Sequence, residues 1–180
     1  MPIVAPSVWS AAAQFCEHLN EVLATTVTQT RLVPARRRAR DIQIDIAFRQ
    51  AGRAIEAPLA TRFGPLRLSL AQVCDGIPWH DDTVQLRTIR YRYTLAVADA
   101  DPLFRWEYGP LLPGFHANHH LQGAVPLQIG RHALSLNDLH LPTGHVGVEE
   151  ILRFCIADLG VRPRSREWNR ILVDSRLITA

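Results

Sequence analysis

Three stretches of the chain carry apolar residues at the three- and four-residue spacing of an amphipathic helix. The first covers 7–24, with Ser7 suited to its N-cap and apolar positions at Val8, Ala12, Phe15, Cys16, Leu19, Val22 and Leu23. The second covers 148–159 and ends before Gly160, a residue suited to the left-handed conformation that follows a helix. The third is predicted over 166–177. The pattern thus predicts one helix near the N-terminus and two near the C-terminus.

Between these helices the apolar spacing changes to two, which is typical of strands with one buried face. The alternation is clear over 41–48, 66–73, 84–98 and 103–108, and 75–78 has the composition of a turn. One face of the third strand is expected to carry Ile89, Tyr91, Tyr93, Leu95 and Val97, and the other Thr88, Arg90, Arg92 and Thr94. On the fourth strand the two faces are expected to carry Phe104, Trp106 and Tyr108, and Arg105 and Glu107.

Strands that follow one another this closely favour an antiparallel meander over a parallel sheet with crossover helices. The aromatic face needs a cover, which the terminal helices can supply. We therefore predict a single α+β domain over 1–180, with a helix at 7–24, an antiparallel β-meander sheet over 41–136 and C-terminal helices over 145–180, the helices packing on one face. Short strands near 126–129 and 133–136 are expected to close the sheet.

The composition of the chain narrows the class of protein and its expected location. The 180 residues carry a net charge of +3, and every basic residue other than histidine is arginine. A cation set made only of planar guanidinium groups suits bidentate contacts to carboxylate or phosphate. No apolar run approaches the ~20 residues that span a bilayer, and the N-terminus lacks the pattern of a signal peptide. We expect a cytoplasmic protein that does not bind membranes. Cys16, Cys74 and Cys155 are expected to be buried structural thiols.

The most closely spaced titratable side chains are three histidines that follow a Pro/Gly-rich stretch. His116, His119 and His120 lie within five residues. Imidazoles titrate near neutrality, so two of them beside arginines could cleave RNA by general acid–base catalysis without a metal. A metal site is a second interpretation, with His116 and His119 joined by His132, Asp138, His140 or His145. A third is structural, with the histidines capping loops or facing solvent. No signature of a zinc protease, nucleotide-binding loop, nucleophile elbow or common nucleic-acid-binding motif is present.

The polar face of the predicted sheet offers a second set of candidates. Arg90, Arg92 and Arg105 lie there in the company of acidic residues. Such a face is commonly solvated or crossed by ion pairs between strands. The alternative is a platform for an anion or for RNA.

The 91–95 segment (Tyr-Arg-Tyr-Thr-Leu), the 103–107 segment (Leu-Phe-Arg-Trp-Glu) and the histidines at 116–120 together resemble TumE-like bacterial toxins. The resemblance covers about 88–122. It implies a toxin encoded beside a helix-turn-helix antitoxin and acting on RNA, with roles for Arg92, Arg105, His116, His119 and His120. The family pattern is His-His-x-His, whereas here His116 comes first and the adjacent pair follows.

Together these observations predict an endoribonuclease toxin that uses neither metal nor cofactor. His119 or His120 would be the general base and His116 the general acid. Arg90, Arg92 and Arg105 would bind the substrate, and the expected partners are RNA and an antitoxin protein. A non-catalytic protein-binding or assembly component and a His-ligated metallohydrolase remain alternatives. The oligomeric state is left open.

Overall fold

The computed structural model describes residues 2–36, 42–97, 102–109, 119–124, 126–129, 132–135 and 141–176, with backbone alone for 126–129 and 132–135. Its helices are α1 (Val8–Thr26), α2 (Val148–Ala157) and α3 (Trp168–Asp174). Its strands are β1 (Val4–Ala5), β2 (Leu32–Arg36), β3 (Ile44–Gln50), β4 (Arg53–Ala54), β5 (Ala57–Thr61), β6 (Gly64–Pro78), β7 (Val84–Ala96), β8 (Pro102–Tyr108), β9 (His119–Gln122), β10 (Pro126–Ile129), β11 (His132–Ser135) and β12 (Leu141–Pro142).

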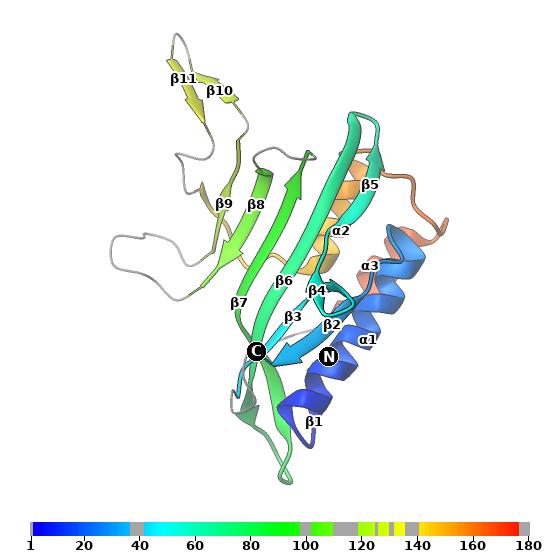
Figure 1. Ribbon diagram of the computed structural model, residues 1–180, viewed down its shortest axis with the longest axis vertical. Helices are drawn as coiled ribbons and strands as arrows, with labels where there is room; N and C mark the ends of the chain where they lie inside the picture. The colour runs from blue at the N-terminus through cyan, green and yellow to red at the C-terminus, as the bar shows by residue number, and fades with distance from the viewer. Residues whose placement is uncertain are drawn as a thin grey trace.

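Most strands join one antiparallel sheet in the order β12-β9-β8-β7-β6-β3-β2, with β1, β4 and β5 paired to β7, β3 and β6 (Figure 1). Consecutive strands β6 to β9 are neighbours in this sheet, so the predicted α+β fold with an antiparallel meander is confirmed. The strands at 126–129 and 132–135 do not close the sheet as expected. They pair only with each other, as a separate two-stranded hairpin.

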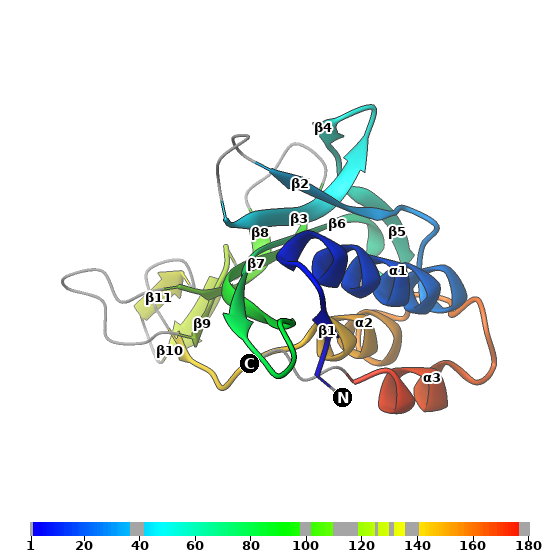
Figure 2. The same cartoon turned by 90° about the horizontal axis from the view of Figure 1, so that it is seen from below.

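The helices cover one side of the sheet, and its curved β2–β3 end wraps over α1 (Figure 2). Helix α1 begins as predicted, because the Ser7 side chain accepts a hydrogen bond from the Ser10 backbone N–H. Its apolar stripe, including Phe15 and Leu19, is buried in the core. The predicted aromatic face is covered as well, since the Phe154 ring of α2 contacts the rings of β8 edge-on. None of the described helices is long and apolar enough to cross a membrane.

The predicted turn at 75–78 is wrong, because β6 continues through it. Asp75 pairs across the hairpin with Arg87, whose guanidinium donates two hydrogen bonds to its carboxylate at 2.9 and 2.7 Å. Gly76 is needed there for packing, since a Cβ at this position would lie 2.5 Å from Cγ2 of Val8. The chain reverses after the end of β6, around Asp81, whose φ is positive.

The structure also differs from the prediction in the face on which Thr88 of β7 lies, and an irregularity in the pairing of β6 with β7 is the reason. Val73 pairs with Arg90 and Cys74 with Thr88, which leaves Ile89 as an extra residue in β7. The extra residue reverses the alternation, so Thr88 is buried on the helix side rather than lying on the face of Arg90. Beyond the bulge the predicted apolar face holds for Tyr91, Tyr93 and Leu95, which are buried against the helices, whereas Val97, predicted on the same face, is 42% exposed.

The three cysteines are buried, as predicted. Burial is the main reason that the pKa of each thiol is raised to about 12, and a protonated thiol is a poor nucleophile. Cys16, Cys74 and Cys155 therefore act as core residues in this fold.

Candidate functional site

The predicted site residues gather on three neighbouring strands, β7, β8 and β9, where two consecutive rows of residues cross the sheet. In the first row, Tyr91 pairs with Tyr108, which pairs with His119. In the second, Arg92 pairs with Glu107, which pairs with His120. Since successive residues of a strand point to opposite faces, the first row faces the helices and the second faces away from them. We call these the helix-side row and the open-face row.

In the helix-side row, His119 is held by contacts on several sides. Its Nδ1 lies 3.1 Å from the Tyr91 hydroxyl, which also accepts a hydrogen bond of 3.2 Å from the Val146 backbone N–H. The Tyr108 ring stacks on the imidazole, with centroids 4.2 Å apart and planes 6° apart. His145, from the connection between β12 and α2, lies 5.8 Å from His119 between ring centroids and is exposed. The imidazoles of His119 and His145 thus both lie against the Tyr91 ring.

The surroundings set the protonation states in this row. Burial lowers the pKa of His119, and the positive charges that His145 and His120 can carry lower it further. The imidazole of His119 is therefore neutral at pH 7. Burial raises the pKa of Tyr91, so its hydroxyl stays neutral, and its oxygen can accept a hydrogen bond from the Nδ1–H of His119. In that tautomer the lone pair of the imidazole is on the second nitrogen, Nε2, which can accept a proton.

Tyr93 and Gln72 pack against the helix-side row and support Tyr91. Tyr93 stacks on Tyr91 with ring centroids 4.6 Å apart, and its hydroxyl accepts a hydrogen bond of 2.5 Å from Gln72. Burial raises the pKa of Tyr93 well above its ordinary value, so it remains a neutral core group. Beside this layer His145, with the buried Glu149, helps to line a small cavity of about 20 Å³. The supporting residues fix the position of Tyr91 and hence of the imidazole bound to it.

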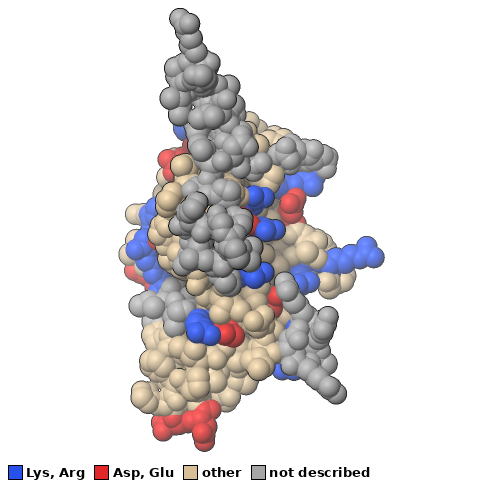
Figure 3. Space-filling model, turned by 90° about the vertical axis from the view of Figure 1, so that its left-hand side faces the viewer, with Lys and Arg blue, Asp and Glu red and all other residues tan. Residues whose placement is uncertain are grey.

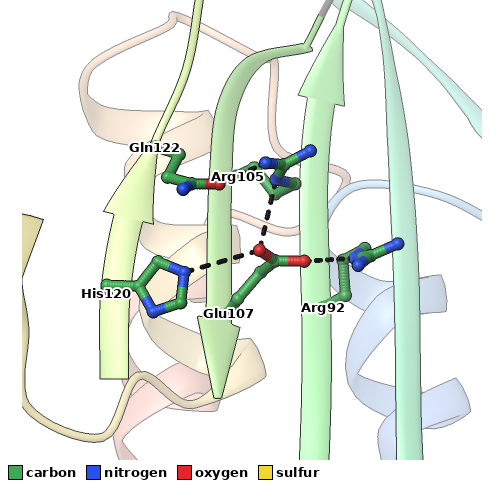
Figure 4. Close-up of polar contacts among 5 residues, drawn as sticks. All are labelled: Arg92, Arg105, Glu107, His120 and Gln122. Carbon is green, nitrogen blue, oxygen red and sulfur yellow. Dashed lines mark hydrogen bonds and ion pairs between the residues drawn. The ribbon is translucent and has the colours of Figure 1, made fainter. Parts of the chain in front are cut away.

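The open-face row is a charged network centred on Glu107 (Figure 4). One carboxylate oxygen accepts a hydrogen bond from Arg92 Nε. The other lies 3.4 Å from Arg105 Nε and 3.5 Å from His120 Nε2. Arg105 also donates to the side-chain oxygen of Gln122. Two guanidinium groups share one carboxylate, so the network keeps positive charge with which it could meet a phosphate.

Within this row the side chains differ in their access to solvent. The Arg92 side chain is 65% exposed, whereas that of His120 is only 10% exposed. Neither ring nitrogen of His120 has appreciable accessible surface. A general acid or base must come within hydrogen-bond reach of the group it serves. The structure therefore gives Arg92 direct access to a ligand and makes His120 a buried part of the network.

Two of the three predicted catalytic histidines are described by the structure. His119 and His120 are both in strand β9, and they point to opposite faces of the sheet. His116 lies outside the described residues. Among the predicted substrate-binding residues, Arg92 and Arg105 meet at Glu107, and Arg90 is exposed on the same face. The structure thus separates the predicted acid–base group His119 from the predicted phosphate binders.

Several members of this site have no predicted catalytic role. The sequence pattern places Tyr91 and Tyr108 on the apolar face, and it offers His145 only as a metal ligand. A signal for the separation of His119 and His120 was present, since neighbouring residues in a strand face opposite ways. No local signal in the sequence places His145 beside His119.

The side of the molecule seen in Figure 3 is of mixed charge. Arginine and acidic side chains lie side by side there in several places, and an acidic group lies at the lower tip. The exposed acids at the β6–β7 hairpin tip are Asp81 and Asp82. In this view the described surface shows no broad basic patch.

In the part of the chain that the structure describes, no group of three or more histidine, cysteine or acidic side chains could hold a metal ion. Two of the metal-ligand candidates, Asp138 and His140, lie outside that part, and the side chain of His132 is not described. Comparison of the chain with protein-family models, with curated proteins and with solved structures finds no match.

Proposed function

We propose that this protein cleaves RNA without a metal ion, with His119 and His145 as its acid–base pair. The observation that carries the proposal is the helix-side row. Two imidazoles lie 5.8 Å apart between centroids, and one of them is oriented through the Tyr91 hydroxyl. Two histidines at this separation can serve the attacking and leaving oxygens of a single phosphate.

Each group has a defined role in the reaction. Neutral His119 takes the proton from the 2′-hydroxyl, whose oxygen then forms a bond to phosphorus. The bond from phosphorus to the 5′-oxygen breaks, and His145 gives a proton to that oxygen. The products are a 2′,3′-cyclic phosphate and a 5′-hydroxyl. The lowered pKa of His119 suits the role of base, because the group is unprotonated at pH 7.

The open-face row supplies binding. Neighbouring strands are about 4.8 Å apart, so the backbones of Arg92 on β7 and His119 on β9 are about 10 Å apart across the sheet, with the two side chains on opposite faces. A strand of RNA that passes over the end of β9 can place one phosphate at His119 and a neighbouring one at Arg92 or Arg105. Exposed Arg90, on the same face, extends the contact.

The resemblance to TumE-like toxins adds a cellular role. We infer that expression of this protein arrests bacterial growth in the cytoplasm and that an antitoxin protein neutralises it. The test is induction of the wild type and of a His119→Ala/His145→Ala double variant at matched soluble levels. Only the wild type should arrest growth and degrade RNA. His80→Ala, which removes an exposed histidine at the β6–β7 tip, is the control and should behave as the wild type.

The purified protein should cleave RNA equally well in excess EDTA and yield cyclic-phosphate ends. Cleavage lost in EDTA and restored by a divalent ion would favour the metallohydrolase. Absence of both cleavage and growth arrest would contradict the proposal.

A non-catalytic protein-binding or assembly component is the second candidate. It is favoured by the inaccessible ring nitrogens of His120 and by the alternation of guanidinium and carboxylate groups in the open-face row. Such a surface suits a partner with the complementary pattern of charges. Stable complex formation with a protein partner, lost in Arg92→Glu but retained in the double histidine variant, would support this candidate if RNA is not cleaved.

A further inference from the structure

A groove of about 730 Å³ lies beside β6, and none of the candidate site residues lines it. Its lining consists of Ala54, Ile55, Glu56, Pro58, Arg67 and Ser69. Its volume is within the range of about 300–1,000 Å³ that small-molecule sites occupy. Three lining residues are apolar and three offer a carboxylate, a guanidinium and a hydroxyl. An apolar lining with a few placed polar groups is the usual make-up of a small-molecule site.

The groove opens on the same face of the sheet as the open-face row. Arg67 pairs with Pro58 of β5, and Ser69 pairs with Thr94 of β7, which pairs with Arg105. Ser69 and Arg105 are thus two strands apart, or about 10 Å. Figure 2 shows β4 on the side of the sheet away from α2 and α3. Ala54 of β4 is one of the residues that line the groove. A ligand in the groove would lie beside the arginines that bind phosphate.

The two charged groups in the groove, Arg67 and Glu56, interact only weakly with each other. Arg67 Nη1 and Glu56 Oε2 are 3.6 Å apart, which is long for a charge-assisted hydrogen bond. Their side chains are 47% and 43% exposed. An exposed ion pair of this kind contributes at most about 1 kcal/mol, so a ligand can replace it at little cost.

We infer that this groove binds a guanine base of single-stranded RNA. Guanine presents N–H donors on one edge, which the Glu56 carboxylate can accept, and O6 and N7 acceptors, to which the Arg67 guanidinium can donate. Pro58 and Ile55 offer apolar contact to the ring. The phosphate attached to that nucleotide then lies toward Arg105. This inference rests on the proposed action on RNA and names its sequence preference.

Nucleotide binding tests the inference separately from cleavage. Guanosine 5′-monophosphate, adenosine 5′-monophosphate and ribose 5-phosphate are titrated into the wild type, Glu56→Gln and Ser69→Tyr, which fills the groove. The wild type should bind the guanine nucleotide at least about tenfold more tightly than the other two, the size expected for one well-made base contact. Glu56→Gln should lose that preference and keep its affinity for ribose 5-phosphate. Ser69→Tyr should also lose the preference for the guanine nucleotide, and its melting temperature should be unchanged.

Equal affinity of the wild type for the guanine and adenine nucleotides would overturn the inference. So would a guanine preference that both variants retain. A protein that prefers guanine but does not cleave RNA would contradict the proposed function and support the groove. If the protein cleaves RNA and Glu56→Gln leaves its preference among nucleotides unchanged, the proposed function is supported and the inference about the groove is contradicted.

Discussion

The helix-side row and the open-face row are built on the same three strands, one residue apart, yet they offer different chemistry. Both end in a histidine. His119 is bound by a hydroxyl, stacked on a neutral ring and lies near a second imidazole, whereas His120 lies against a carboxylate and two guanidinium groups. Burial lowers the pKa of His119, and the nearby His145 and His120 lower it further. The two adjacent histidines differ in their surroundings because alternation along β9 turns them to opposite faces of the sheet.

The largest effect is expected from His145, the one member of the proposed acid–base pair outside β9. His145→Ala should slow RNA cleavage by about 10² to 10⁴, the usual range for loss of a general acid. His145 is exposed, so its removal should leave the melting temperature unchanged. Single-turnover cleavage by the purified variants measures this, with His80→Ala as the control. A fall of less than threefold would remove His145 from the mechanism.

The open-face row should show its role in binding. Arg92→Ala and Arg105→Ala should each weaken binding of an RNA oligonucleotide by up to about tenfold and reduce the slope of log affinity against log salt by about one. Arg170→Ala, which removes an exposed arginine of α3 that pairs with Glu167, is the matched change in charge. Equal losses in all three variants would mean that net charge alone attracts RNA.

Glu107 should matter for stability more than for chemistry. Glu107→Ala leaves Arg105 and His120 without the carboxylate between them, and we expect a loss of about 1 kcal/mol of unfolding free energy. The side chain is 17% exposed, so solvent screens part of the interaction. Urea denaturation measures the effect, and Glu56→Gln, in an exposed ion pair, should change the stability much less. Equal losses would contradict a central role for Glu107.

The smallest effect concerns pH. Because the folded pKa of His119 is lowered, the unfolded chain binds more protons between that value and 6.5. The contribution of neutral His119 to stability is therefore complete above pH 6.5 and decreases as the pH falls toward the folded pKa. In His145→Ala the pKa of His119 should rise only part of the way to 6.5, since burial is the larger cause. NMR titration of the imidazole resonances measures both values, and a pKa above 6.5 in the wild type would be the contrary result.

Much of the fold could be predicted because its signals are local. The helical spacing of α1 and α2, and the alternation along β7 and β8, follow from which residues must be buried. The 75–78 segment was mistaken for a turn because its composition indicates one, whereas pairing of Asp75 with Arg87 and close packing at Gly76 continue the strand. The bulge at Ile89 depends on register with β6, which no single strand reveals.

The site was less predictable for the same reason. Arg92 and Arg105 were placed on one face by alternation alone, and the structure brings both to Glu107. Strand β9 has only four residues, too few for the alternation of their side chains to predict a strand from the sequence. The meeting of His119 with His145 depends on the path from β12 to α2, which is a tertiary feature.

The most direct test of the central claim compares His119→Ala with His120→Ala, two adjacent residues with the same change in composition. Cleavage of one RNA substrate is measured for both at equal concentrations of folded protein. If the helix-side row carries the chemistry, His119→Ala should lose at least about a hundredfold in rate. His120→Ala should stay within a few-fold of the wild type once its folded fraction is taken into account. An inactive His120→Ala beside an active His119→Ala would contradict the account and move the reaction to the open face.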